Sequence, residues 1–224
     1  MDEMDPAAMA DVMAMDDDAT LAMLKFERFE RVSGGGAFAW KVSAWAGGDF
    51  DRALLRSEGE RADGGIDRAD AELLWNHAIA AFWNTELGVR RDFGQGADRQ
   101  WIAFGVSGLA PYGIELGATG YLGGAGRSAV RVELDYEVVL TQRLILQPRL
   151  ELDAHGRDDA AARTGSGLSD AAFGLRLRYE IRREFAPYVG VEWSRRFGRS
   201  ADYAQADGHG NRDAQLVAGV RFWY

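Results

Sequence analysis

The chain has 224 residues, no cysteine and a formal net charge of −9. The missing cysteines exclude disulfide scaffolds, thiolate metal sites and cysteine nucleophiles, and the lack of a basic excess argues against nucleic acid as a partner. No segment offers the roughly 20 consecutive apolar residues that a membrane-spanning helix needs.

The first 23 residues differ in composition from all that follow. They hold seven acidic residues, no Lys or Arg, and all six methionines of the chain: Met1, Met4, Met9, Met13, Met15 and Met23. They carry −7 of the net charge, so the rest of the chain, with 26 basic and 28 acidic residues, is close to neutral. Acidic segments with few large apolar residues bury too little surface to fold. We therefore expect a disordered tail over residues 1–23 and one folded domain over residues 24–224.

The folded domain shows apolar and polar residues in alternation, most clearly in Arg131–Val138. A period of two places successive side chains on opposite faces of a β-strand. The pattern predicts about twelve strands, near residues 24–32, 37–46, 52–60, 70–79, 84–93, 99–108, 112–122, 128–140, 143–155, 168–182, 187–198 and 213–224.

The connections between these strands alternate in predicted length. Short turns are expected at residues 47–51, 80–83, 109–111, 141–142 and 183–186, and longer loops at 61–69, 94–98, 123–127, 156–167 and 199–212. An even number of hairpin-linked strands of about ten residues, with short periplasmic turns and longer outer loops, is typical of outer-membrane proteins. We therefore expect an all-β, transmembrane antiparallel up-and-down barrel with both termini in the periplasm.

A soluble β-sandwich or barrel would show the same alternation. Two features favour the membrane. One face of several successive strands is ionic, with no helical segment predicted to cover the apolar face. Aromatic residues also gather near strand ends, where interfacial girdles lie.

Four long segments resemble the outer-membrane copper resistance protein B family. They are AFGVSGLAPYGIELGATGYLG (103–123), LTQRLILQPRLEL (140–152), GSGLSDAAFGLRLRYEIRREFAPYVGVEWSRRFG (165–198) and AGVRFWY (218–224). The resemblance implies an outer-membrane barrel of a Gram-negative bacterium with a role in copper tolerance, and a methionine-rich N-terminal region that binds the copper. Family tails commonly interleave histidine with methionine, whereas here no histidine precedes His77.

The six methionines are the predicted copper ligands. Thioether sulfur is a soft ligand that suits copper(I), and the spacings within the tail bring two or three sulfurs within reach of one ion. His155 and His209, near Asp153, Asp158 and Asp207, are secondary metal candidates. Outer-membrane lipid, copper and a periplasmic copper-binding protein are the expected partners.

The ionic face predicts a network inside the barrel. Its members either lock the shape of the barrel or form a polar path for cations: Arg131, Glu133, Asp135, Glu137, Arg149, Glu151, Asp153, Arg176, Arg178, Glu180, Glu192 and Arg196.

Three functions remain open at this point. The first is copper binding by the tail, with sequestration of the ion or its passage through the barrel. The second is a general small-solute porin with a structural ionic lumen. The third is an outer-membrane hydrolase built from Ser166, Ser169 or Ser194 with a histidine; no residue can be assigned the orienting role that such a site needs, so we expect no enzymatic activity.

Overall fold

The computed structural model describes residues 20–33, 36–62, 64–94 and 97–224. Its strands are β1 Leu21–Val32, β2 Phe38–Gly47, β3 Asp51–Ala62, β4 Gly65–Ala80, β5 Trp83–Gly94, β6 Arg99–Ala110, β7 Ile114–Gly123, β8 Arg127–Asp135, β9 Val138–Val139, β10 Leu144–His155, β11 Gly167–Tyr179, β12 Phe185–Arg196 and β13 Arg212–Trp223. These bounds lie within a few residues of most of those predicted from alternation.

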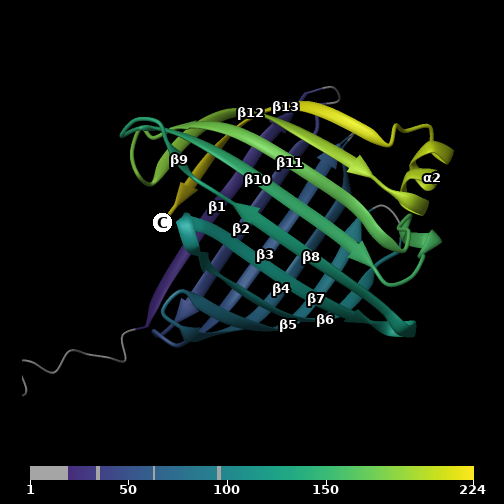
Figure 1. Ribbon diagram of the computed structural model, residues 1–224, viewed down its shortest axis with the longest axis horizontal. Helices are drawn as coiled ribbons and strands as arrows, with labels where there is room; N and C mark the ends of the chain where they lie inside the picture. Colours follow the sequence, from purple (N-terminus) through teal and green to yellow (C-terminus); the bar gives the residue numbers. More distant parts are fainter. Residues whose placement is uncertain (1–19, 34–35, 63, 95–96) are drawn as a thin grey trace, which may run out of the picture.

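The strands form one closed barrel (Figure 1). Each strand pairs antiparallel with its neighbours in the chain, and β1 closes the sheet by pairing with β13. The segments β8 and β9 both pair with β10 and are two parts of one strand, so the barrel has twelve strands. This confirms the predicted fold class. The strand expected over 128–140 is interrupted because the chain leaves β7 after Asp135 and continues beside β10 alone.

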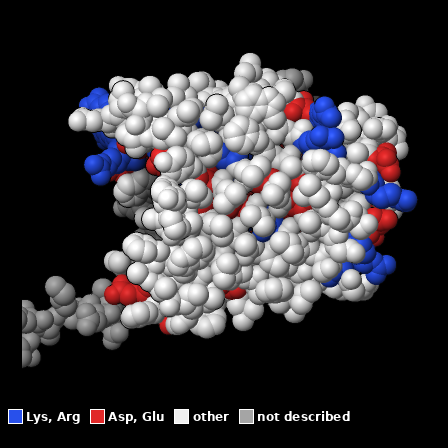
Figure 2. All heavy atoms as spheres, in the orientation of Figure 1, with Lys and Arg blue, Asp and Glu red and all other residues white. Residues whose placement is uncertain are grey.

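The two faces of the sheet differ in chemistry. Leu55, Val89 and Phe104 point outward and are about half exposed (51%, 56% and 47%), whereas Glu72 and Arg176 point inward and are 4% and 5% exposed. Lys, Arg, Asp and Glu gather at the two ends of the barrel, and other residues make up most of the surface between the ends, with a few charged residues visible among them (Figure 2). An outward apolar band around a polar interior is the arrangement of a barrel that sits in lipid.

The connections fall into two sets at opposite ends. The short-turn end comprises residues 48–50, 81–82, 111–113, 140–143 and 180–184. At the long-loop end, among the connections that the structure describes in full, residues 156–166 and 197–211 are long. The prediction of long loops over 61–69 and 123–127 was wrong: β3 and β4 stay paired as far as Ala62 and Gly65, and a short 3₁₀ turn, Gly124–Gly126, joins β7 to β8.

The last long loop contains a helix, α2 Gly198–Ala206, which the sequence pattern did not indicate. It buries Ser200, Ala201 and Ala204 against β11 and β12. None of the helices in the described part of the chain is long and apolar enough to cross a membrane.

Candidate functional site

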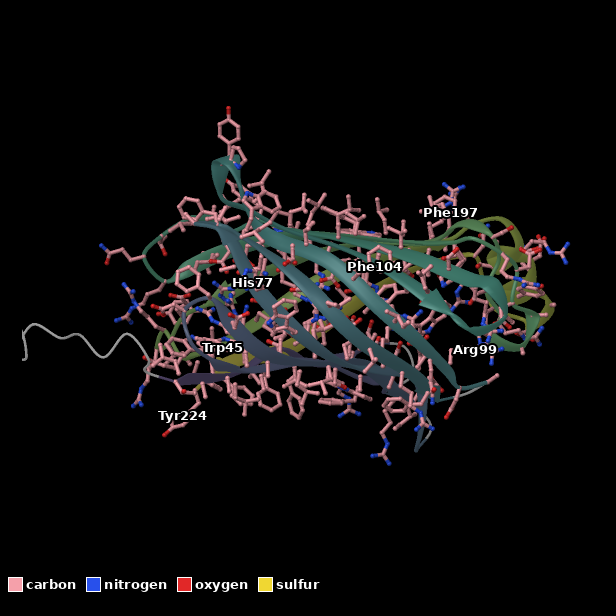
Figure 3. All side chains as sticks on the ribbon, turned by 90° about the horizontal axis from the view of Figure 1, so that it is seen from below. Trp45, His77, Arg99, Phe104, Phe197 and Tyr224 are labelled. Atoms are coloured by element: carbon pink, nitrogen blue, oxygen red, sulfur yellow. The ribbon has the colours of Figure 1, made fainter. Side chains whose placement is uncertain are left out.

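The lumen is crossed by ion pairs that join opposite walls. Lys41 on β2 donates two hydrogen bonds to Glu133 on β8, both 2.8 Å long. These strands are six positions apart in a ring of twelve, so this pair spans the barrel. Figure 3 shows polar side chains filling the interior between the two ends. The ionic face predicted from the sequence is therefore a network across the lumen as well as along its wall.

Three carboxylates meet at the centre of this network. Oxygens of Glu58, Glu133 and Glu151 lie within 4.8 Å of one another. Four basic side chains surround them, and each forms an ion pair with at least one of the three: Arg28, Lys41, Arg131 and Arg149. Carboxylate oxygens suit hard cations, but here guanidinium and ammonium groups already neutralise them. We call this cluster the central hub.

A second cluster joins side chains of β1, β11 and β12 inside the barrel. Arg176 donates hydrogen bonds to Glu30, at 2.7 and 3.1 Å, and to Glu192, at 2.6 Å. Tyr188 donates a further bond of 2.8 Å to Glu30, which is 1% exposed. Charge-assisted pairs that approach bidentate geometry are the strong ones in proteins, so Glu30 is buried only because these donors satisfy it.

Glycine makes room for this cluster. A Cβ added at the inward-facing Gly190 would lie 2.5 Å from the Leu175 carbonyl oxygen and 2.8 Å from the Cγ of Arg176. One added at Gly219 would lie 2.5 Å from the Phe29 carbonyl oxygen and 2.6 Å from the Cβ of Glu30. Real side chains do not approach so closely, so the long ionic side chains cross the lumen over strand positions that carry no side chain.

A third cluster lines the wall from β3 to β8. Arg56 donates to Glu72 at 2.9 Å and to Glu86 at 2.7 Å, and the Tyr121 hydroxyl donates to Glu72 at 2.7 Å. An apolar cluster lies on the same wall: Leu74, Trp101, Tyr121, Ala103 and Ala129. Polar and apolar side chains together fill this half of the lumen.

The space that remains is divided into small cavities. One of about 100 Å³ lies toward the long-loop end, and two of about 40 and 30 Å³ lie deeper. Glu58, Asp70 and Arg131 line both the first and the second, while Arg28 and Arg149 line both the first and the third. Residues that line two cavities lie between them, so side chains of the central hub stand between cavities that are each large enough for only a few water molecules.

The short-turn mouth has its own group of charges. Glu137 accepts hydrogen bonds from Arg178 at 3.0 Å and from Arg221 at 2.8 Å, and Arg178 also bonds Glu180 at 3.3 Å. These residues line a cavity of about 290 Å³ at the rim.

Most of the twelve predicted network residues meet inside the barrel. Arg196 is at the long-loop rim instead, where its side chain is 48% exposed and lies 3.9 Å from Asp170. The first five strands contribute further charged residues to the network, which were not predicted although the same alternation is present there. These residues are Arg28, Glu30, Lys41, Arg56, Glu58, Asp70, Glu72, Glu86 and Arg90.

One predicted methionine ligand lies within the barrel wall. Met23 is on β1, directly opposite Trp45 of β2, because the strand begins at Leu21 and not at residue 24. Lys25 lines the lumen, and alternation places Met23 on the same inward face at the short-turn end. Met1, Met4, Met9, Met13 and Met15 lie outside the described residues.

The two histidine candidates lie at the opposite end of the barrel from Met23. His155 Nδ1 is 3.0 Å from Ser169 Oγ, and that hydroxyl also donates to the Asp153 carbonyl oxygen at 3.0 Å. His209 is exposed after α2. Among the described residues, the three-residue grouping of possible metal ligands is the central hub, which includes neither histidine.

The two long loops hold each other in place. The Gly165 amide donates a 2.8 Å bond to the buried Ser200 hydroxyl, and Asp159 accepts two bonds from Arg99 of β6, at 2.8 and 2.9 Å. Figure 3 labels Arg99 at this end. The hydrogen bonds from Arg99 lower the pKa of Asp159, and bonds from Ser166 lower the pKa of Asp158. Both carboxylates are therefore favoured in their charged form.

The fold and this interior define a class, the outer-membrane β-barrel with an ion-paired lumen. Two solved porins are similar to the chain in fold: the NanC porin, with a TM-score of 0.59 and 15% identity, and the KdgM porin, with a TM-score of 0.53 and 13% identity. Each match covers 89% of this chain and 98% of the porin. At such low identity the similarity concerns the fold alone.

Sequence comparison gives the family. The profile described as "Copper resistance protein B precursor" matches residues 20–224, and the chain belongs to this family. It is 50% identical over 190 residues to the copper resistance protein B homolog of Pseudomonas syringae pv. tomato, and 44% identical over 204 residues to copper resistance protein B of Escherichia coli. The matches cover 85% and 91% of this chain but 65% and 69% of those relatives.

Proposed function

We propose that this protein contributes to copper resistance by binding copper(I) through its methionines at the short-turn end, with the barrel as the membrane anchor of that site. Family membership supports the role in copper resistance. Thioether ligands favour copper(I) over harder cations. The inward position of Met23 adds one thioether at the mouth to those of the preceding segment.

The small size of the lumen cavities supports a barrel that anchors the copper site and does not conduct the ion. An ion that crosses the barrel needs connected space, and the central hub stands between cavities of about 100, 40 and 30 Å³. The lumen lining contains arginine and carboxylate groups, which offer copper(I) no soft ligand. Retention of the ion at the mouth fits this interior better than passage through it.

We further propose that the short-turn end faces the periplasm. Strand β1 starts there, and the chain ends beside it: Leu24 and Tyr224 exchange two backbone hydrogen bonds of 2.9 Å. Short turns on the periplasmic side are the rule in outer-membrane barrels. In this orientation the methionines could receive copper from a periplasmic copper-binding protein.

The porin alternative makes a different prediction about flux. A general porin would pass copper and an unrelated small solute at similar rates through liposomes that contain the barrel. We expect both rates to stay near those of empty liposomes, because the central hub separates the cavities. Equal and substantial flux of both would favour the porin.

The hydrolase alternative has less support from geometry. Ser169, which lies 3.0 Å from His155 Nδ1, has no exposed surface and already donates its proton to a backbone carbonyl. A nucleophile must reach its substrate, so we propose a function without catalysis. Hydrolysis of ester or peptide substrates by the pure protein would contradict this.

The test of the proposal is copper(I) titration of the full chain against a chelator competitor. Replacing Met4, Met9, Met13 and Met15 together by leucine keeps size and apolar character but removes four sulfurs. We expect affinity to fall at least about tenfold, equivalent to about 1.4 kcal/mol. The matched control is Met23→Leu alone, which we expect to cause a smaller loss. Unchanged copper(I) affinity in the variant that lacks all four methionines would contradict the proposal.

A further inference from the structure

Two arginines face each other on the outer wall at the long-loop end. Arg195 on β12 is directly opposite Arg212 on β13 in the strand register. Both are exposed, and both lie on the outward face, since Trp193 and Leu216 of the same strands point outward. Like charges directly opposite each other destabilise a sheet, because their Cβ atoms lie only about 5 Å apart.

No carboxylate in the described part of the chain forms an ion pair with either arginine. The nearby Asp213 faces inward and accepts bonds from the Ala214 amide and the Gln215 side chain. The Arg195 guanidinium lies over the Phe197 ring, 4.8 Å from its centroid, which holds it at the surface. The pair is thus an uncompensated double positive charge.

The surroundings of the pair indicate a lipid as its partner. On the membrane side of it lie exposed apolar side chains of β11, β12 and β13, namely Phe173, Trp193 and Leu216 at 42%, 42% and 64% exposure. On the other side lie the loops, where both basic and acidic side chains reach the surface (Figure 2). Phe197, which contacts Arg195, lies near this end of the barrel (Figure 3). Basic groups just above an apolar band lie at the depth of lipid headgroups.

We propose that Arg195 and Arg212 together bind a phosphate group of lipid A, the phosphorylated glycolipid anchor of the outer leaflet. Guanidinium groups match phosphate oxygens in a forked geometry, and one phosphate between them removes their mutual repulsion. The acyl chains of the same lipid then cover Trp193 and Leu216. The choice of leaflet depends on the orientation proposed above, whereas copper binding by the methionines does not depend on this lipid.

The test is thermal unfolding of the full chain in neutral detergent, followed by heat-modifiable gel migration, during titration with bisphosphorylated lipid A. We expect the lipid to raise the midpoint, and the double variant R195A/R212A to need about tenfold more lipid for the same rise. Arg31→Ala is the matched control, because Arg31 is also exposed on an outward position but lies opposite Ala218. We expect this control to titrate like the parent.

A second measurement covers the case in which the double variant folds poorly. Without lipid, Arg212→Ala alone relieves the repulsion, so its midpoint should equal or exceed that of the parent; with lipid A, its midpoint should be lower than the parent's. The proposal fails if the double variant or Arg212→Ala responds to lipid like the parent, or if the Arg31 control loses as much. It also fails if dephosphorylated lipid A, inorganic phosphate or phosphatidylglycerol raises the midpoint equally.

Discussion

The two ends of the barrel are built on different principles. At the long-loop end, residues 156–166 and 197–211 pack on each other and bond to β6 through Asp159 and Arg99. At the short-turn end the turns are brief, the rim holds a cavity of about 290 Å³, and both the first strand and the C-terminus lie there. One end is therefore held together by its own loops and the other has an open cavity at its rim, with the central hub between them.

The largest loss of stability should come from removing the partner of a buried charge in the lumen, between the two ends. Arg176→Ala leaves Glu30 with Tyr188 as its remaining hydrogen-bond donor at a site that is 1% exposed. Breaking a buried pair in this way costs about 3–5 kcal/mol. Urea unfolding in lipid vesicles, followed by tryptophan fluorescence, measures it. Arg196→Ala, at the rim, is the control and should change stability by less than about 1 kcal/mol; equal losses would contradict the assignment.

A smaller loss of stability should follow from replacing a glycine of the lumen wall by a larger residue. Gly190→Leu places a side chain where Arg176 crosses the lumen, and overpacking of this kind costs about 1–3 kcal/mol. The same unfolding experiment applies. Gly65→Leu is a suitable comparison, since a Cβ there meets nothing within 4 Å. A Gly190→Leu variant as stable as the parent would show that the lumen has free space beside Arg176.

The strands of the barrel were largely predictable from the sequence, whereas the contacts across the lumen were not. Alternation located nearly every strand, because each strand has one face toward lipid and one toward a polar interior. It could not predict that Lys41 meets Glu133, 92 residues away, because that contact depends on closure of the ring. It also placed the start of the first strand after Met23, since Leu21–Met23 lacks a polar residue to show alternation.

The fastening of the long loops should depend on pH. The pKa of Asp159 is lowered below its ordinary value of 3.8 by the bonds from Arg99. A lowered pKa in the folded state means that the stabilisation is complete above the ordinary value and is lost as pH falls through the lower one. Hydrogen exchange of residues 156–166, corrected for its intrinsic pH dependence, should therefore speed up below about pH 4. Asp159→Asn should exchange fast at every pH, and a parent loop that stays protected in strong acid would contradict the role of Asp159.

The smallest expected effect is on copper(I) affinity when a histidine at the long-loop end is removed. His209 is exposed in the long loop, far along the barrel from Met23. His209→Ala should leave copper(I) affinity unchanged within measurement error. The same chelator competition that tests the methionines measures this, and a loss as large as that of the methionine variant would move the copper site to the long-loop end.

The most direct test of the central claim is X-ray absorption spectroscopy of the full chain loaded with one equivalent of copper(I). If the methionines at the short-turn end hold the ion, its first shell contains sulfur, as thioether ligation requires. The central hub could offer only carboxylate oxygens from Glu58, Glu133 and Glu151. We expect a shell that contains sulfur; a shell of oxygen or nitrogen without sulfur would contradict binding by the methionines.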